Sequence, residues 1–142
     1  MNFRGFLERS LTLLAAEAPQ AYRAVVATLG KRSVNLQVDE ETLALFAVKK
    51  ALVTAPPLEQ ATTTARTSRR TLGRLLQGEQ DLTQAILSDE VALFGGVEDL
   101  TTLYDALLCY FRGAVRSPGF PALLDQFLGS PPSAPQLPVL PA

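Results

Sequence analysis

The strongest constraint on the fold is the order of short elements at the centre of the chain, between Ala61 and Phe111. The threonine-rich run Ala61–Thr67 is typical of a strand, because β-branched side chains pack well on a pleated sheet. Thr67 and Ser68 can cap a short helix with a leucine-rich face, and Gly78 ends it. This order supplies much apolar surface and few groups that could catalyse a reaction.

The second half of this stretch continues with a helix, a strand and a longer helix. Asp81 opens another short helix, and the apolar strand Val91–Phe94 stops at Gly95-Gly96. From Glu98 the spacing predicts a long amphipathic helix. Its apolar face repeats at helical intervals through Leu100, Leu103, Tyr104, Leu107, Leu108, Phe111 and Val115.

The flanking segments predict two helices and three strands before this stretch and one helix after it. The expected segments are Phe3–Glu17, Pro19–Leu29, Val34–Val38, Thr42–Val48, Ala51–Thr54 and a helix that begins at Phe120. We therefore expect one domain over residues 1–129, with N-terminal helices in 1–29 and the sheet and remaining helices in 33–128. Residues 130–142 form a separate proline-rich tail.

Composition limits the class of protein. A chain of 142 residues has the size of one domain. With 47% apolar and 19% charged residues, it is typical of a globular protein rather than a disordered one. The net charge of −1 gives no large field that would gather nucleic acid, so no nucleic-acid partner is expected.

The N-terminal segment has one feature of a signal peptide, because Arg4 precedes an apolar stretch. However, Glu8 and Arg9 interrupt that stretch, and Pro19 stands where a small-residue cleavage site is needed. The longest uncharged apolar runs are shorter than the roughly 18 residues of a membrane span. We therefore expect a cytoplasmic protein.

Catalytic residues are scarce. The chain has no histidine, which removes the commonest general base and most zinc sites. Its one cysteine, Cys109, lies beside the apolar stripe of the long helix, where a structural role is favoured. The acidic pairs, such as Glu98-Asp99, stand at expected turns and helix starts. The sequence therefore predicts a protein that is not an enzyme and has no metal site or cofactor.

Four arginines gather near the first central helix, at Arg66, Arg69, Arg70 and Arg74. Arg70 and Arg74 are four residues apart and share a helix face. One interpretation is a solvated surface. The other is a site for anionic head groups, of a ligand or of a membrane surface, formed by Arg70 and Arg74.

The tail supports two interpretations. It contains Pro131, Pro132, Pro135, Pro138 and Pro141, a composition typical of a polyproline-like linker. Alternatively, its apolar residues pack over a pocket mouth or against a neighbouring molecule, which would form a homodimer.

The motifs of the central stretch are Thr67-Ser68, Leu76-Gln77-Gly78, Asp81-Leu82 and Val91 to Gly95. In this order they resemble the sterol carrier protein type-two domain family, the non-specific lipid-transfer fold. The resemblance covers about Tyr22 to Phe127 at the level of elements. It implies an α+β fold, in which helices cover one face of a five-stranded, mostly antiparallel sheet and an apolar cavity lies between them.

Under this resemblance, we expect the cavity to bind a fatty acid, acyl thioester, sterol or phospholipid without chemistry; transfer of the ligand is a second role that the resemblance suggests. The expected lining residues are Leu72, Leu76, Ile86, Leu103, Leu107, Phe111 and Phe120. Tyr104 and Tyr110 are expected to place a hydroxyl near a polar head. The alternative is an interaction or accessory module for lipid or quinone metabolism, in which the same apolar groove holds a partner protein.

Overall fold

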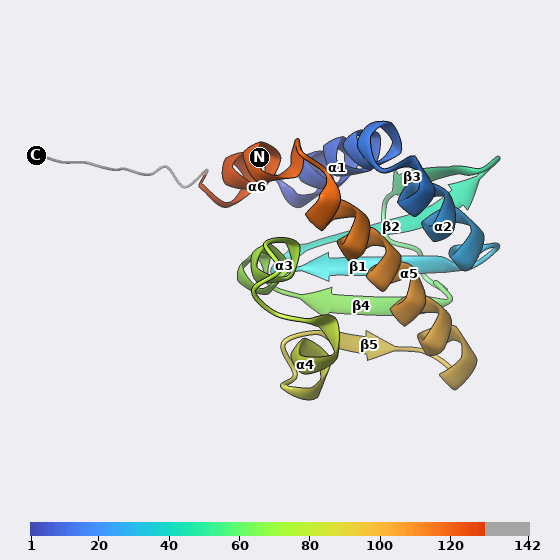
Figure 1. Cartoon of the computed structure of the whole chain (residues 1–142). Coiled ribbons are helices and arrows are strands. Elements are labelled where there is room, and N and C mark those ends of the chain that lie inside the picture. Colours follow the sequence, from blue (N-terminus) through green and yellow to red (C-terminus); the bar gives the residue numbers. More distant parts are fainter. Residues whose placement is uncertain (130–142) are drawn as a thin grey trace, which may run out of the picture.

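The structure, a computed structural model, describes residues 1–129 (Figure 1). The predicted roles of the tail therefore lie outside the described residues. In chain order, the elements are α1 (Phe3–Glu17), α2 (Pro19–Leu29), β1 (Ser33–Val38), β2 (Glu41–Val48), β3 (Ala51–Ala55), β4 (Thr63–Thr67), α3 (Arg69–Leu76), α4 (Leu82–Leu87), β5 (Ala92–Phe94), α5 (Val97–Arg116) and α6 (Phe120–Leu128). The predicted elements are confirmed, with boundaries that shift by at most a few residues.

The strands form one five-stranded sheet in the order β3-β2-β1-β4-β5. All neighbouring pairs are antiparallel except β1 and β4, which are parallel, so the prediction of a mostly antiparallel sheet is confirmed. The parallel pair requires the β3–β4 connection to cross the sheet. Asn35 on β1 holds that connection: its amide donates to the Leu58 carbonyl at 2.8 Å and its side-chain oxygen accepts from the Leu58 N–H at 3.0 Å.

Strand alternation separates the two faces of the sheet. Leu36 on β1 stands opposite Leu43 on β2 and Ala65 on β4, and these three side chains lie on one face. Helices α1, α2 and α5 pass across this face (Figure 1). Asn35 and Gln37 alternate to the other face, as expected for a sheet with helices on one side only.

Local capping explains where the short helices begin. The Ser68 hydroxyl accepts from the Thr71 N–H at 3.0 Å at the start of α3. The Asp81 carboxylate accepts from the Gln84 N–H at 2.7 Å at the start of α4. These caps satisfy backbone donors that a helix leaves open in its first turn. Gly95, with φ of 152°, provides the exit from β5 toward α5.

The buried side chains form two hydrophobic clusters. The larger one joins the sheet to α1, α2, α5 and α6. The smaller one joins α3 and α4 and contains Leu75, Leu82, Ala85 and Val91. Phe111 on α5 packs against both clusters. Within residues 1–129, no helix has both the length and the apolar character needed to cross a bilayer.

Candidate functional site

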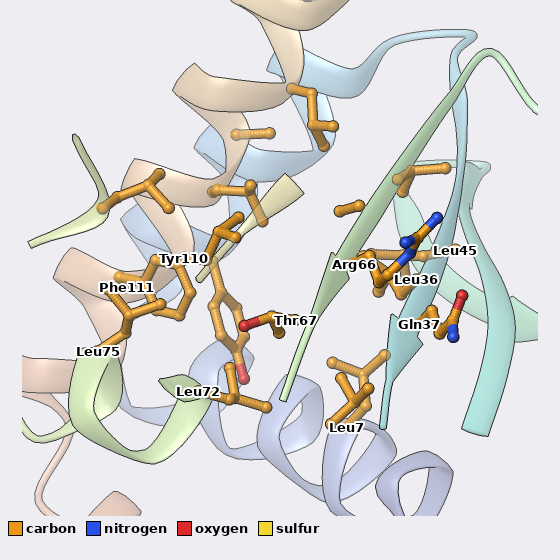
Figure 2. Close-up of a pocket in the computed structure, with 18 of the residues that line it drawn as sticks. Leu7, Leu36, Gln37, Leu45, Arg66, Thr67, Leu72, Leu75, Tyr110 and Phe111 are labelled. Atoms are coloured by element: carbon orange, nitrogen blue, oxygen red, sulfur yellow. The ribbon is translucent and has the colours of Figure 1, made fainter. Parts of the chain in front are cut away.

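An apolar cavity of about 90 Å³ lies between the sheet and the helices (Figure 2). Its wall draws on α1 to α5, together with β1, β2 and β4. Leu7, Leu36, Leu45, Leu72, Tyr110 and Phe111 are among the residues that line it. Segments from distant parts of the chain therefore meet around one hollow.

The floor of the cavity is the central part of the sheet. Leu36 and Ala65 are register partners on β1 and β4, and both face the helices. Ala65 has a short side chain, which leaves room above it. Gln37 and Arg66 also border the cavity, but their side chains point away from it, as Figure 2 shows. These two residues contribute main chain, so the floor remains apolar.

The polar groups beside the cavity are already paired. The hydroxyls of Tyr110 and Ser10 lie 2.8 Å apart, and the Ser10 hydroxyl donates to the Leu7 carbonyl at 2.8 Å. Burial raises the pKa of the Tyr110 phenol, so this group stays neutral. The Thr67 hydroxyl donates to the Glu90 carbonyl at 2.9 Å. A ligand in the cavity would therefore meet carbon atoms rather than free hydrogen-bonding groups.

The cavity is small for a complete ligand. Pockets that enclose small molecules are typically about 300–1,000 Å³. An engineered apolar cavity of about 150 Å³, a worked example from another protein, stays dry and binds benzene. The present cavity of about 90 Å³ has room for only one end of an apolar chain unless its wall moves.

Four of the predicted lining residues border the cavity. Leu72 comes from α3, and Leu103, Leu107 and Phe111 come from successive turns of α5. The 3.6-residue period places these α5 side chains on the face that covers the sheet. Their role in holding a ligand stays a prediction.

The other three predicted lining residues, and Tyr104, lie outside the cavity lining. Leu76 and Phe120 pack where α3, α5 and α6 meet. Ile86 and Tyr104 pack against the smaller cluster, and the Tyr104 hydroxyl lies 2.6 Å from that of Thr83. Tyr104 is therefore directed toward α4 rather than toward the floor of the cavity.

The four arginines of the basic segment do not form one surface. Arg66 lies over the Phe94 ring, 5.1 Å from its centroid. Arg69 joins α3 to the ends of the described chain, because its guanidinium donates to the Phe127 and Met1 carbonyls. The other two are the predicted head-group site.

Arg70 and Arg74, the predicted head-group residues, differ in their surroundings. Arg70 is exposed. The Arg74 guanidinium lies 3.6 Å from the Glu90 carboxylate, a partly exposed ion pair. A head group at this site would therefore compete with Glu90 for Arg74, and its binding there stays a prediction.

The sequence interpretation missed the contribution of the first two helices to the cavity. Phe3, Leu7 and Leu11 from α1, with Val25 and Leu29 from α2, line it. Their helical spacing is typical of residues that are buried on one face of a helix. It held no signal that this buried face borders a hollow rather than a filled core.

Among residues 1–129, no three His, Cys, Asp or Glu side chains come together as a possible metal site. Cys109 is half-buried and packs against the larger hydrophobic cluster. This placement agrees with the structural role favoured for this thiol from the sequence.

No family model and no curated protein matches the sequence. Among solved structures, a crystal structure of sterol carrier protein 2 matches with a TM-score of 0.57 and 16% identity, over 80% of this chain and 95% of that one. A ubiquinone synthesis protein, UbiJ-SCP2, matches with a TM-score of 0.54 and 19% identity, over 78% of this chain and 97% of that one. These matches confirm the predicted sterol-carrier-like α+β fold.

A third solved structure belongs to a much longer protein. The stereoselective inverting sec-alkylsulfatase Pisa1 from Pseudomonas sp. matches with a TM-score of 0.47 and 19% identity over 64% of this chain. The match spans 14% of the length of that enzyme.

Proposed function

We propose that this chain, which has the fold of sterol carrier protein 2, binds the apolar chain of a lipid in the cavity between its sheet and its helices. The observation that carries the proposal is the cavity itself, because apolar side chains line it and the neighbouring hydroxyls already form hydrogen bonds within the protein. The role is binding without chemistry. Transfer of the lipid between surfaces is an extension of the same proposal.

The physical basis is the removal of methylene groups from water. Each methylene that enters an apolar site contributes about 0.8 kcal/mol. Because the lining within residues 1–129 offers no free side-chain hydroxyl, it favours no particular functional group inside the cavity. Binding should therefore depend more on chain length than on polar substituents near the buried end.

The first test is native mass spectrometry of gently purified protein, followed by lipid extraction from the same sample. We expect a stoichiometric adduct that extracts as a fatty acid, phospholipid or isoprenoid. A fluorescent long-chain fatty acid provides the second measurement, because oleate should displace it. A bare mass together with no uptake of the fluorescent fatty acid would contradict the proposal.

A second candidate is an accessory module for lipid or quinone metabolism that binds a partner protein. The small size of the cavity favours it, because about 90 Å³ does not enclose a lipid. The likeness to a structure described as a ubiquinone synthesis protein adds support. A bare mass in the same experiment, with a complex that forms on addition of a quinone-synthesis protein, would favour this candidate.

A further inference from the structure

A groove opens to solvent beside the cavity, between the α3–α4 connection and α5. Its volume is about 720 Å³, within the range of about 300–1,000 Å³ that is typical of ligand pockets. Its floor is apolar and consists of Leu75, Leu82, Leu108, Phe111 and Val115. Val115 is 56% exposed, so the outer part of the groove offers apolar surface to solvent.

Three side chains separate the groove from the cavity. Leu75 of α3, Leu82 of α4 and Phe111 of α5 line both hollows. Figure 2 shows Phe111 and Leu75 side by side at the edge of the cavity. Phe111 is half-buried and its ring packs edge-on against Tyr110, with 5.4 Å between the centroids. The two hollows would therefore join only where these three side chains move aside.

The two volumes determine how a chain could lie. The cavity is too small for a complete acyl chain, whereas the groove has the size of a ligand pocket. The wall that both hollows share at Phe111 is therefore a route by which a chain whose end occupies the cavity could continue into the groove. Two parallel chains would not fit the cavity of about 90 Å³, which favours a lipid with a single chain.

The charges on the rim of the groove are divided between its two sides. Arg112 and Arg116 stand one turn apart on α5, and both are exposed. Within residues 1–129, neither has a carboxylate within ion-pair distance, although the Arg116 side chain donates to the Arg112 carbonyl at 3.2 Å. Glu79 and Asp81 lie on the opposite side, on the α3–α4 connection. An anionic group is therefore attracted to the α5 side.

We propose that the groove is the outer half of the lipid site and binds a long-chain fatty acid, with its carboxylate at Arg112 and Arg116. The chain would run over Val115, pass Phe111 and end in the cavity. This inference rests on the proposed lipid binding. It adds where the head group lies, which charge it carries and that the lipid has one chain.

The charge is tested with a fluorescent long-chain fatty acid and its methyl ester, each titrated at low salt. In the double variant Arg112→Gln/Arg116→Gln, we expect binding of the acid to weaken about 2- to 30-fold, from one exposed ion pair per arginine. Binding of the uncharged ester should not change. Arg23→Gln, an exposed arginine on α2, is the matched control and should bind both probes like the wild type.

The groove is tested with two valines on the same helix. Val115→Glu places a carboxylate in the groove, whereas Val97→Glu places one at the far end of α5, where valine is 82% exposed. We expect Val115→Glu to weaken binding of the acid at least about threefold, and Val97→Glu to leave it unchanged. Both sites are exposed, and equal melting temperatures would show that both variants fold.

The outcomes separate this inference from the proposed function. If the wild type binds neither probe, lipid binding itself fails and the inference fails with it. The wild type could bind both probes while the Arg112/Arg116 variant binds the acid as tightly as Arg23→Gln does. In that case the groove is not the head-group site, and lipid binding stands. A loss of acid binding in Arg70→Gln instead would also overturn the inference, because it would place the carboxylate at α3.

Discussion

Two regions of the helical layer differ in how completely they are packed. Where α1, α3 and α6 meet, Phe6 and Phe127 are fully buried and their rings stack with 4.3 Å between centroids. The Arg69 guanidinium lies over the Phe127 ring, 4.2 Å from its centroid. Where α5 crosses β1 and β4, the cavity remains. The first region is filled by side chains, whereas the second leaves the space in which we propose that a ligand binds.

The C-terminal end of α5 is also closely packed, against α1 and α2. A β-carbon at Gly113 would lie 2.5 Å from the β-carbon of Ala21 and 2.7 Å from a methyl group of Leu14. Such distances require a residue without a side chain. This end of α5 is therefore held close to its neighbours, while the turns around Leu103 and Leu107 border empty space.

The largest expected effect is the loss of a ring from the packed region. Phe127→Ala should lower the free energy of unfolding by about 3–5 kcal/mol, because it leaves a hollow and removes the ring beneath Arg69. Leu36→Ala, in the cavity floor, should cost less, since Leu36 is half-buried and already borders empty space. Urea unfolding measures both. Equal losses would contradict the contrast between the two regions.

Filling the cavity should reduce ligand uptake without lowering the stability of the fold. Ala65→Leu adds methyl groups above the sheet floor, so we expect loss of fatty acid uptake with unfolding free energy kept or raised by about 0.5–2 kcal/mol. Ala92→Leu, on the other face of the sheet, is the matched control and should retain uptake. Fluorescent fatty acid titration and urea unfolding measure the two quantities. Normal uptake by Ala65→Leu would show that the cavity does not hold the ligand.

Much of the fold was predictable because its signals are local. Ser68 and Asp81 are helix caps in the sequence and in the structure, and the glycine pair after Phe94 separates β5 from α5. Caps and breaks act within one turn of backbone, so a short window of sequence contains them.

The site was harder to predict because a buried face need not border a hollow. Leu72 and Leu76 lie one turn apart on α3, with 7% and 5% of their surfaces exposed. Leu72 lines the cavity, whereas Leu76 packs toward α6. Helical spacing gives both residues the same signal. The difference depends on which distant element packs opposite each one.

The surroundings of charged residues were hard to predict for the same reason. Arg69 and Arg70 are adjacent and identical in type, yet Arg69 binds main-chain oxygens of Met1 and Phe127 while Arg70 is exposed. These two partners of Arg69 come from the two ends of the described chain, and a third, the Glu41 carboxylate at 3.2 Å, comes from β2. Only the folded structure brings them together, so the sequence suggested a basic surface that the structure divides.

A smaller effect should appear when the packed region is titrated with acid. The Ser117 hydroxyl and the Gly119 N–H both donate to the Glu17 carboxylate, and they hold the pKa of Glu17 below its ordinary value of 4.5. A lowered pKa in the folded state stabilises the fold above the ordinary pKa, and this contribution is lost as the pH falls through the folded value. Urea unfolding from neutral to acidic pH should therefore show a steeper loss in the wild type than in Glu17→Gln. Parallel profiles would show that this link between α1 and the α5–α6 connection does not respond to pH.

The smallest effect is expected at the head-group site predicted from the sequence, which lies on α3 between the two regions. Because Arg74 forms an ion pair with Glu90 and Arg70 is exposed, Arg70→Ser/Arg74→Ser should reduce pelleting with anionic liposomes at low salt only slightly. Each arginine near an anionic bilayer contributes at most about 1 kcal/mol, and salt screens that attraction. Arg112→Ser/Arg116→Ser is the matched comparison on α5. A large loss of pelleting in the α3 variant alone would restore α3 as the surface that binds anionic lipid. It would also show that the surface that contacts membranes, on α3, differs from the proposed site of the fatty acid carboxylate on α5.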